Sequence, residues 1–327
     1  MVERLPETRG MTPSPARAHL EEGPGEYDGS PQPPSPVDLP QVLNPPRPQN
    51  KSKHSRCKNK IKKKMKVSIK IASLNMNSRG VTDPTNPTSK WGDIHQLIKD
   101  KRIGALALQE THLAPEDTAR LLQIFGKHLH IISSPDPLSI STRGVALVLN
   151  KDITNTANVR STEVIPSRAL LVTLPWHGTL TLHILVVYAP NQSTPNCKFW
   201  QNLQTKWSEM GLPTPDLFLG DFNLVEDQLD HSPCHGDALA VTTALQDLRT
   251  FFGTQDGWRL TNPEDQNFTY PVLGTSSRSR IDRIYISEEL FPTSLDWSIK
   301  DTAVCTDHKL TFIRIFNLKA PFIGKGC

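Results

Sequence analysis

The chain has 327 residues, enough for one large α/β domain or two small ones, and its apolar content of 36% is low for a protein that is folded throughout. Its five cysteines are scattered and never spaced as Cys-x-x-Cys, which argues against a disulfide framework and a zinc ribbon. Because no apolar run could span a bilayer and the N-terminus lacks the apolar core of a secretory signal, we expect a soluble, intracellular protein without a membrane partner.

The modest net charge of +4 conceals two different segments before the folded part. Residues 1–50 lean acidic and are crowded with proline, without apolar periodicity, so we predict a disordered tail. Residues 51–66 (KSKHSRCKNKIKKKMK) are mostly lysine and arginine and predict a solvated basic linker. Such a run is typical of nuclear import or of phosphate screening on a polyanion, and a plain solubilising linker is the alternative. We therefore expect a nuclear protein, with the cytoplasm as the alternative location.

The folded part is predicted to begin with two strands joined by a helix. The first strand covers 67–74 and stops at Asn75-Met-Asn77. Ser89 can cap a helix that carries its large apolar residues on one face, and 103–108 reads as a buried strand. That second strand ends in Gln109-Glu110-Thr111-His112, so both strands run directly into polar residues.

The remaining pattern predicts many strands that follow one another in pairs, with few helices between them. We expect helices near 116–125, 196–209 and 237–252 and strands at 129–133, 143–150, 159–165, 168–174, 180–187, 280–286, 295–300 and 309–316. A turn at Trp176-His-Gly178 precedes the strand at 180–187, and 216–220 is a further buried strand. This order favours two mixed sheets packed face to face with helices outside each.

Polar residues recur where the predicted strands end. These residues are Asn75, Glu110, Tyr188, Asp221 with Asn223, Asp282, and Asp307 with His308. Asp221 and Asn223 lie two positions apart on an extended backbone, so their side chains point the same way and offer an anionic acceptor beside an amide donor. That pair suits hydrolysis of a phosphate ester. Taken singly, each residue is also typical of a solvated strand end or an Asx turn.

One other polar cluster is a candidate metal site. The segment His231-Ser-Pro-Cys234-His235 matches no standard zinc spacing, and a polar loop that contains proline explains it better.

Six motifs carry a family resemblance. SLNMNS, QETH, YAPN, GDFN, SRIDRIYIS and TDHK occur in this order and together resemble the endonuclease/exonuclease/phosphatase superfamily. The likeness is strongest to the apurinic-endonuclease-like domain of non-LTR retrotransposons. It implies a four-layer α/β/β/α sandwich of the DNase I-like type over 67–318. Residues 319–327 resemble the stretch that leads toward a reverse transcriptase, so we expect a truncated or stand-alone copy whose longer relatives have a reverse transcriptase as partner or fusion.

The resemblance also implies a role for each matched residue. Glu110 would be the main ligand of Mg²⁺, with Mn²⁺ as an alternative, and Asp307 and Asn77 would lie near the metal. Asp221 would activate water, Asn223 and Asn75 would hold the phosphate, Tyr188 would lie near the leaving oxygen, and Asp282 would orient His308 to stabilise charge on phosphorus. Asn77 stands where repair-type enzymes carry aspartate, which points to the retrotransposon subtype.

Three arginines lie around the motif that contains Asp282. We expect Arg278, Arg280 and Arg283 to contact DNA phosphates beside the scissile bond, with Phe268 and Tyr270 on the same approach and a flexible hinge at 274–277. A solvated polar loop is the alternative reading of this stretch.

These expectations converge on a monomeric, Mg²⁺-dependent endonuclease that nicks duplex DNA and leaves 3′-hydroxyl and 5′-phosphate ends. A messenger-RNA deadenylase and a phospholipid or inositol phosphatase are alternatives within the superfamily. The inositol phosphatases carry a tryptophan-cysteine-aspartate-arginine signature, whereas this chain has Ser279-Arg-Ile-Asp-Arg283. A catalytically decayed copy that only binds DNA is the third alternative, and the acidic and histidine residues retained at the matched positions count against it.

Overall fold

The computed structural model describes residues 68–83, 86, 89–139, 142–176, 180–271 and 274–317. The predicted disordered tail (1–50), basic linker (51–66) and C-terminal extension (319–327) lie outside the described residues, as do Leu273 and positions 177–178 of the predicted turn.

The first of two six-stranded sheets contains the first strand of the domain near its middle. Its order is β14 (Ser294–Lys300), β15 (Leu310–Phe316), β1 (Ser68–Asn75), β2 (Ala105–Gln109), β4 (Val145–Asn150) and β3 (Leu129–Ser134). β1 and β2 run parallel, and the other neighbours in this sheet are antiparallel.

The second sheet repeats this arrangement. Its order is β10 (Thr254–Asp256), β13 (Asp282–Ser287), β8 (Leu217–Asp221), β7 (Thr181–Tyr188), β6 (Ala169–Pro175) and β5 (Arg160–Ile165). β7 and β8 are the parallel pair, again third and fourth in the order, and their neighbours are antiparallel.

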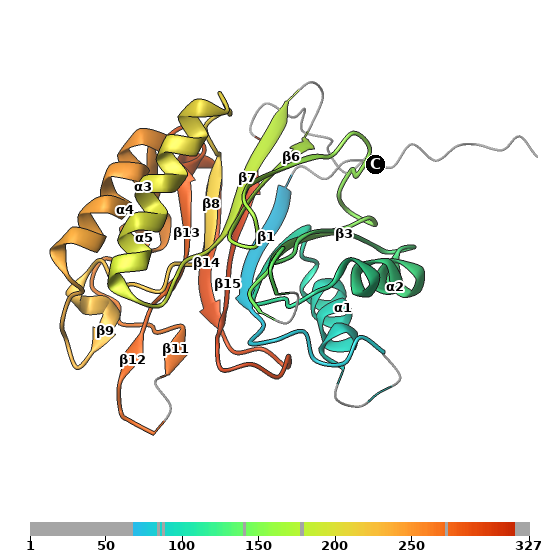
Figure 1. The fold of residues 1–327 in the computed structure, drawn as a ribbon, viewed down its shortest axis with the longest axis horizontal. Coiled ribbons are helices and arrows are strands. Elements are labelled where there is room, and N and C mark those ends of the chain that lie inside the picture. Colours follow the sequence, from blue (N-terminus) through green and yellow to red (C-terminus); the bar gives the residue numbers. More distant parts are fainter. Residues whose placement is uncertain are drawn as a thin grey trace, which may run out of the picture. The chain divides into compact units, whose positions relative to one another are not determined.

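Four long helices cover the outer faces of the sheets. Figure 1 shows α1 (Lys90–Lys101) and α2 (Pro115–Phe125) on one side and α3 (Ser193–Glu209) and α4 (Leu239–Phe252) on the other. In α1 the buried residues are Trp91, Ile94, Leu97 and Ile98, the spacing of one helical face. The helix ends where Arg102 adopts the left-handed conformation, with φ of 53°.

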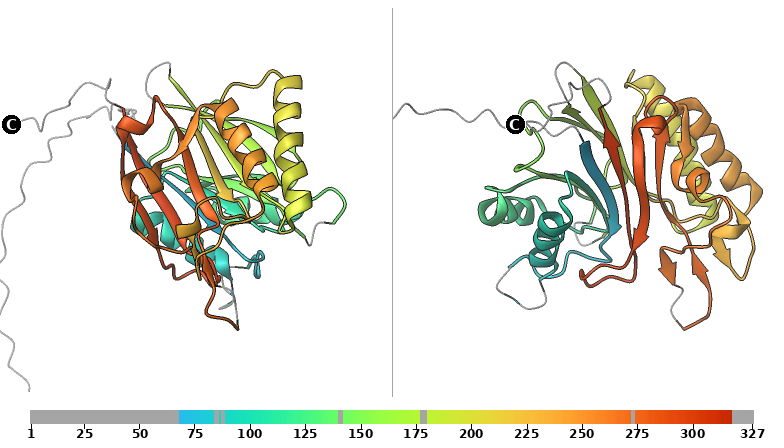
Figure 2. Two further views of the ribbon diagram at one scale, coloured as in Figure 1. Left: turned by 90° about the vertical axis from the view of Figure 1, so that its left-hand side faces the viewer. Right: turned by 180° about the vertical axis from the view of Figure 1, so that it is seen from behind.

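Three apolar cores separate the layers. Along β2, Ala105 and Ala107 face the core between the sheets, while Leu106 and Leu108 pack against the first helical layer. On the other side, Trp200 of α3 packs edge to face against Phe218 of β8, with ring centroids 6.0 Å apart. The order helix, sheet, sheet, helix is visible from both sides in Figures 1 and 2 and confirms the predicted four-layer sandwich.

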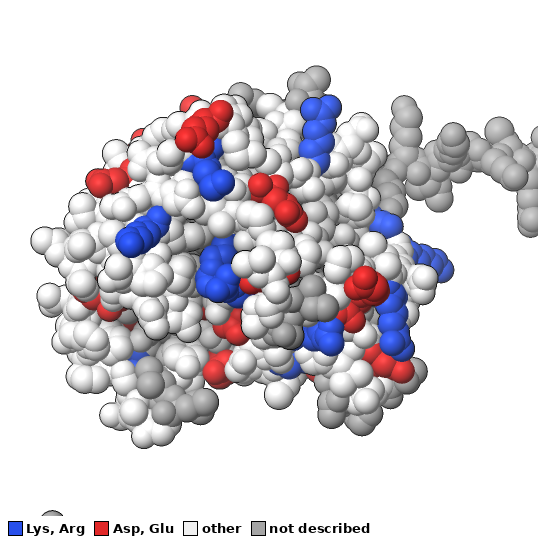
Figure 3. All heavy atoms as spheres, viewed as in Figure 1, with Lys and Arg blue, Asp and Glu red and all other residues white. Residues whose placement is uncertain are grey.

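Short elements complete the domain. They are α5 (Gly257–Thr261), the 3₁₀ turns Gln228–Asp230 and Phe291–Thr293, and a small sheet of β11 (Tyr270–Pro271), β12 (Arg278–Ser279) and β9 (His231–Ser232). Within the described ranges, no helix combines the length and apolar character needed to cross a membrane. Figure 3 shows acidic and basic side chains interspersed over one face of the molecule, so this face does not carry a field of a single sign.

Candidate active site

The two parallel strand pairs bring the predicted residues to one edge. β1 ends at Asn75, β2 runs into Glu110, β7 ends at Tyr188 and β8 ends at Asp221. The antiparallel strands β13 and β15 begin at the same edge, and Asp282 pairs in register with Asp221. The first sheet therefore contributes Asn75, Glu110 and His308, and the second contributes Tyr188, Asp221 and Asp282. This edge lies at the bottom of Figure 1, beside β11 and β12.

Asn75 connects the two sheets. Its fully buried side-chain nitrogen donates to Oε1 of Glu110 at 2.9 Å and to Oδ2 of Asp221 at 2.8 Å. Its side-chain oxygen accepts a hydrogen bond from the backbone nitrogen of Asn77 at 2.8 Å. The amide nitrogen donates two hydrogen bonds and the amide oxygen accepts one, so the side chain is fixed between two carboxylates.

Asp221 reaches the site because a glycine precedes it. Gly220 has a φ of +148°, and a Cβ at this position would lie 1.9 Å from the carbonyl oxygen of Val187 on the neighbouring strand. The absence of a side chain therefore lets β8 approach β7 directly before the carboxylate. Burial raises the pKa of Asp221, and the charge of Asp282 raises it further, to about 7, against the opposing effects of His308 and the hydrogen bond from Asn75.

His308 is paired with a buried carboxylate. Its Nδ1 lies 2.8 Å from Oδ2 of Asp282, and the backbone nitrogen of Asp282 donates to Oγ1 of Thr269 at 3.0 Å. Burial acts to lower the pKa of His308, but the charge and hydrogen bond of Asp282, with Asp221 and Asp307, raise it to about 9. The imidazole is therefore protonated at neutral pH. The ring of Tyr270 lies over it, with centroids 4.7 Å apart, as expected for a residue on the approach to the site.

Tyr188 and Asn223 lie at the ends of β7 and β8. Burial raises the pKa of Tyr188 strongly, and the neighbouring charges of Glu110 and Asp221 add to the effect, so the phenol stays neutral. Asn223 donates from its side chain to the carbonyl of Ala189 at 2.9 Å, and its backbone nitrogen donates to Oδ1 of Asp221 at 2.9 Å. Asn223 thus anchors the turn after β8, and its predicted contact with the phosphate stays an expectation.

Two cationic residues at this edge, Arg168 and Lys90, were not predicted from the sequence. Arg168 lies over the ring of Tyr188 at 4.9 Å and donates to the Tyr188 carbonyl at 2.9 Å. Lys90 donates from Nζ to the carbonyls of Met76 at 2.6 Å and Asn77 at 2.8 Å. Both residues act on backbone carbonyls distant in sequence, so no local motif signals them.

The oxygen ligands available for a metal lie on the first sheet and its loops. Glu110 has a left-handed backbone with φ of 51° and a side chain that is 24% exposed. Asn77 donates from its side chain to Oδ1 of Asp307 at 3.1 Å, which brings the last carboxylate to the loop after β1. Carboxylate and amide oxygens with access to water form a donor set that fits Mg²⁺.

A second group of possible ligands suits a different role. Asp221, Asp282 and His308 offer ligand atoms within 4.8 Å of one another, and all three are buried. A protonated imidazole has no free lone pair for a metal, and Nδ1 of His308 already contacts Asp282. We therefore interpret this group as a charge-paired acid and base unit.

The structure contradicts two of the three expected DNA contacts. Arg280 and Arg283 are only 2% and 1% exposed, so neither reaches a phosphate. Arg280 donates from Nε to Asp230 at 2.8 Å and from Nη2 to Asp256 at 2.7 Å, and Arg283 lies 3.5 Å from Asp230. These aspartates are distant in sequence, so the arginine cluster alone gave no sign that its charges are neutralised inside the protein. Arg278 is exposed on β12 and keeps its predicted role as an expectation.

The segment from His231 to His235 behaves as a polar structural element. Nδ1 of His231 lies 2.8 Å from Oγ of Ser279, and Nε2 lies 2.9 Å from Oγ of Ser277. Both ring nitrogens are therefore engaged in hydrogen bonds, as the interpretation of this segment as a polar loop implied.

Known proteins resemble this chain in sequence or in fold. The transposon TX1 uncharacterized 149 kDa protein of Xenopus laevis is 29% identical over 260 residues, which cover 76% of this chain and 18% of that protein, so the chain spans under a fifth of this relative. The AP endonuclease of Leishmania major has a similar fold, with a TM-score of 0.62 and 14% identity over 76% of this chain and 88% of that one. The endonuclease domain of TRAS1, a telomere-specific non-LTR retrotransposon, has a TM-score of 0.56 and 12% identity over 77% of this chain and 100% of that domain. The model of the Endonuclease/Exonuclease/phosphatase family matches residues 72–308, and this chain therefore belongs to that family.

Proposed function

We propose that this chain is a divalent-metal-dependent endonuclease that hydrolyses phosphodiester bonds in duplex DNA and leaves 3′-hydroxyl and 5′-phosphate ends. The observation that carries the proposal is the position of Asn75, whose amide links Glu110 to Asp221 at 2.9 and 2.8 Å. This contact holds the candidate metal ligand next to the candidate base.

The electrostatics support a division of roles across the edge. Asp221, with a pKa of about 7, exchanges protons near neutral pH and suits a base that takes a proton from attacking water. His308, with a pKa of about 9, is a cation that can stabilise the negative charge developing on phosphorus. Tyr188 is a neutral phenol that would donate a hydrogen bond to an oxygen of the scissile phosphate.

Glu110 would hold a Mg²⁺ or Mn²⁺ ion, with Asp307 and Asn77 beside it, since this set offers only oxygen donors. The ion would supply charge neutralisation at the phosphate. Lys90, whose Nζ holds the carbonyls of Met76 and Asn77, fixes the loop on which these donors lie.

DNA is the favoured substrate because of what the similar proteins are named. One is named an AP endonuclease, another is the endonuclease domain of a retrotransposon, and the relative from Xenopus is a transposon protein. The exposed Arg278, on β12 beside the site, would contact a backbone phosphate as a monomer binds the duplex. The transposon relative is much longer than this chain, which fits the expectation of further domains, such as a reverse transcriptase, in full-length elements.

A nicking assay on supercoiled plasmid, with Mg²⁺ and with chelator, tests this function. The parent should convert supercoiled to open-circular DNA only with Mg²⁺, and the nicks should prime a DNA polymerase, which requires 3′-hydroxyl ends. Asp221→Asn should reduce the rate by roughly a hundredfold or more, because it removes the base while keeping the shape. Asp247→Asn, an exposed position on α4, is the matched control and should behave as the parent.

The alternatives give different results in the same experiment. Shortening of poly(A) RNA without plasmid nicking would identify a deadenylase, and phosphate release from inositol phosphates or phospholipids would identify a phosphatase. DNA binding without any hydrolysis would identify a catalytically decayed copy.

A further inference from the structure

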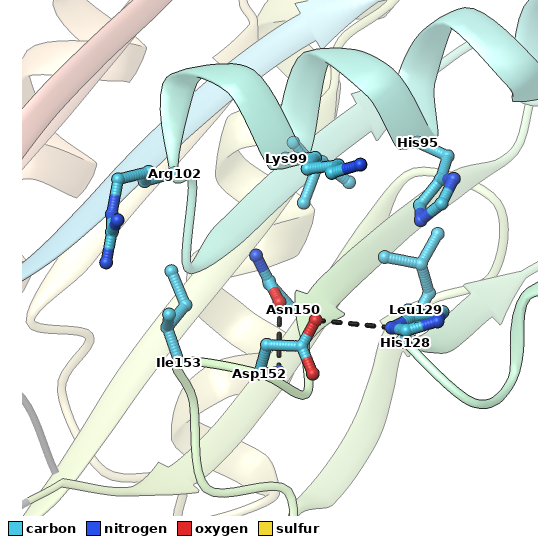
Figure 4. A pocket seen from close by; sticks show the side chains of 9 residues that line it. His95, Lys99, Arg102, His128, Leu129, Asn150, Asp152 and Ile153 are labelled. Atoms are coloured by element: carbon cyan, nitrogen blue, oxygen red, sulfur yellow. Dashed lines mark hydrogen bonds and ion pairs between the residues drawn. The ribbon is translucent and has the colours of Figure 1, made fainter. Parts of the chain in front are cut away.

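A pocket lies at the opposite edge of the first sheet from the active site. It has a volume of about 390 Å³, and its lining includes His95, Lys99, Arg102, His128, Asn150 and Asp152 (Figure 4). Arg102 precedes β2, and Glu110 follows it, so the strand separates this pocket from the metal ligands by roughly 15 Å. The pocket therefore takes no part in the active site.

The side-chain amide of Asn150 faces into this pocket. Asn150 is only 7% exposed, and its side-chain oxygen accepts a hydrogen bond from the backbone nitrogen of Asp152 at 3.0 Å. Its side-chain nitrogen has no partner in the part of the chain that the structure describes, and Figure 4 shows this nitrogen on the side toward α1. This nitrogen keeps access to solvent through the pocket, so it can donate a hydrogen bond to a ligand there.

Two cations lie at the rim of the pocket. Lys99 lies in the last turn of α1 and Arg102 directly after the helix, and both are exposed. Neither forms an ion pair within the described ranges. Together with the amide of Asn150, they offer hydrogen-bond donors to an anionic ligand.

Ring faces form another wall of the pocket. The rings of His95 and His128 have centroids 5.7 Å apart, and Nδ1 of His128 lies 3.2 Å from the carboxylate of Asp152. Burial lowers the pKa of His95, and the nearby His128 and Lys99 lower it further, so this ring is neutral at pH 7. A neutral, half-buried ring can stack on a flat heterocycle.

A second hollow continues the basic lining along the same edge. It has a volume of about 360 Å³, shares Arg102 and Ile153 with the first, and adds Lys70, Lys101 and Arg314, with Asp100 as its one carboxylate. Burial lowers the pKa of Lys70 and repulsion from Arg314 adds to this effect, whereas Asp296, which lies 3.0 Å from Arg314, opposes it. An anion bound between Lys70 and Arg314 would relieve that repulsion.

We propose that the two hollows bind single-stranded nucleic acid, with a nucleotide in the pocket at Asn150 and the next phosphate at Lys70 and Arg314. Each hollow falls within the range of roughly 300–1,000 Å³ typical of ligand pockets, and each is large enough for one nucleotide. Cations that follow a backbone, combined with rings that stack on bases, are the usual means of binding an unpaired strand. A base paired in a duplex would not be free to enter between α1 and the turn at Asn150.

The test measures binding of a fluorescent single-stranded 20-mer to the full chain by fluorescence anisotropy, in chelator and with saturating unlabelled duplex to occupy the active-site edge. Lys99→Gln combined with Arg102→Gln should weaken binding by roughly tenfold and reduce the slope of log affinity against log salt by about 1.4, since each phosphate contact on a single strand contributes about 0.7. Asn150→Asp, which keeps the shape but replaces the donor with a charge, should weaken binding without the same loss of slope. Lys198→Gln combined with Lys206→Gln on α3 is the control and should match the parent.

Thermal melting confirms that each variant is folded, and the double variant changes only exposed side chains. Equal affinity and equal salt slope for the parent and the double variant would overturn the proposal. If the chain bound thymidine monophosphate tightly through Asn150 but did not bind the 20-mer, single-strand binding would be contradicted and the pocket would be assigned to a free nucleotide. The readout is independent of catalysis, because plasmid nicking by the double variant should equal that of the parent whether or not the nuclease function holds.

Discussion

Nδ1 of His308 lies 2.8 Å from a carboxylate oxygen of Asp282, and this contact joins the loop before β15 in the first sheet to β13 in the second. Asp282 thereby orients the ring and keeps it protonated. Asp282→Asn preserves the shape but removes the charge, so we expect the single-turnover cleavage rate to fall by roughly a hundredfold while DNA affinity changes little. The exposed Asp301→Asn, in the loop that leads to His308, is the control. A fully active Asp282→Asn enzyme would show that His308 needs no charged partner.

Glu110 is expected to dominate metal binding. Glu110→Gln keeps the hydrogen bond from Asn75 but loses the charge, so titration calorimetry should show at least roughly tenfold weaker Mg²⁺ binding than in the parent. Glu116→Gln, an exposed change in the first turn of α2, should leave the affinity unaltered. Unchanged binding by Glu110→Gln would move the metal to other ligands.

Arg278 and Arg280 should respond differently to the same substitution. Arg280→Ala removes the buried cation that contacts both Asp230 and Asp256 and leaves these carboxylates with only Arg259 and Arg283 nearby, so the free energy of unfolding should fall by roughly 3 kcal/mol in urea denaturation. Arg278→Ala should leave stability unchanged and weaken DNA binding at all sites alike, as expected for a phosphate contact. If Arg280→Ala proved as stable as the parent, the buried ion pairs of Arg280 would contribute nothing to the free energy of unfolding.

The same network predicts how stability depends on pH. Burial acts to raise the pKa of Asp230, but the charge and hydrogen bonds of Arg280 prevail and hold it below its ordinary value, and the pKa of Asp256 is lowered in the same way. The stabilisation is therefore complete above about pH 4 and is lost as the pH falls through the lower folded-state values. Asp230→Asn should flatten this acid limb in melting temperatures recorded between pH 2.5 and 6, whereas Asp247→Asn should retain it.

The basic run at 51–66 is expected to add affinity that does not depend on sequence. A chain that begins at Lys66 should bind duplex DNA with a shallower salt slope but cut with a similar maximal rate, because each lysine that neutralises a phosphate releases a counterion. Equal salt slopes for the full and the shortened chain would show that residues 51–66 do not contact DNA, and their role would then be nuclear import or none.

The sequence predicted most of the layered fold because strands buried on both faces read as apolar runs. β8 is the clearest example, since Leu217–Asp221 follows the predicted strand closely and ends in the expected carboxylate. The convergence of Asn75, Glu110, Asp221 and His308 was also predictable, because each follows or precedes a strand that ends at the same edge.

Features that depend on distant partners could not be read from the chain. The sequence predicted Arg280 as a DNA contact, but in the structure its side chain bonds to Asp230, fifty positions earlier. Arg168 acts on the carbonyl of Tyr188, and the pocket at Asn150 is built from three separate segments. The short elements β10 and α5 are too brief to produce a recognisable periodicity.

The hydrogen bond from Asn75 to Asp221 and the contact between Asp282 and His308 both cross from one sheet to the other. The active-site residues therefore also hold the two sheets together through non-covalent contacts. A cation or a product phosphate bound by residues of both sheets would add contacts between them, so ligand binding should raise the melting temperature of the whole sandwich in a single transition. A substitution that lets one sheet slide against the other would separate base from metal ligand while leaving every catalytic residue in place.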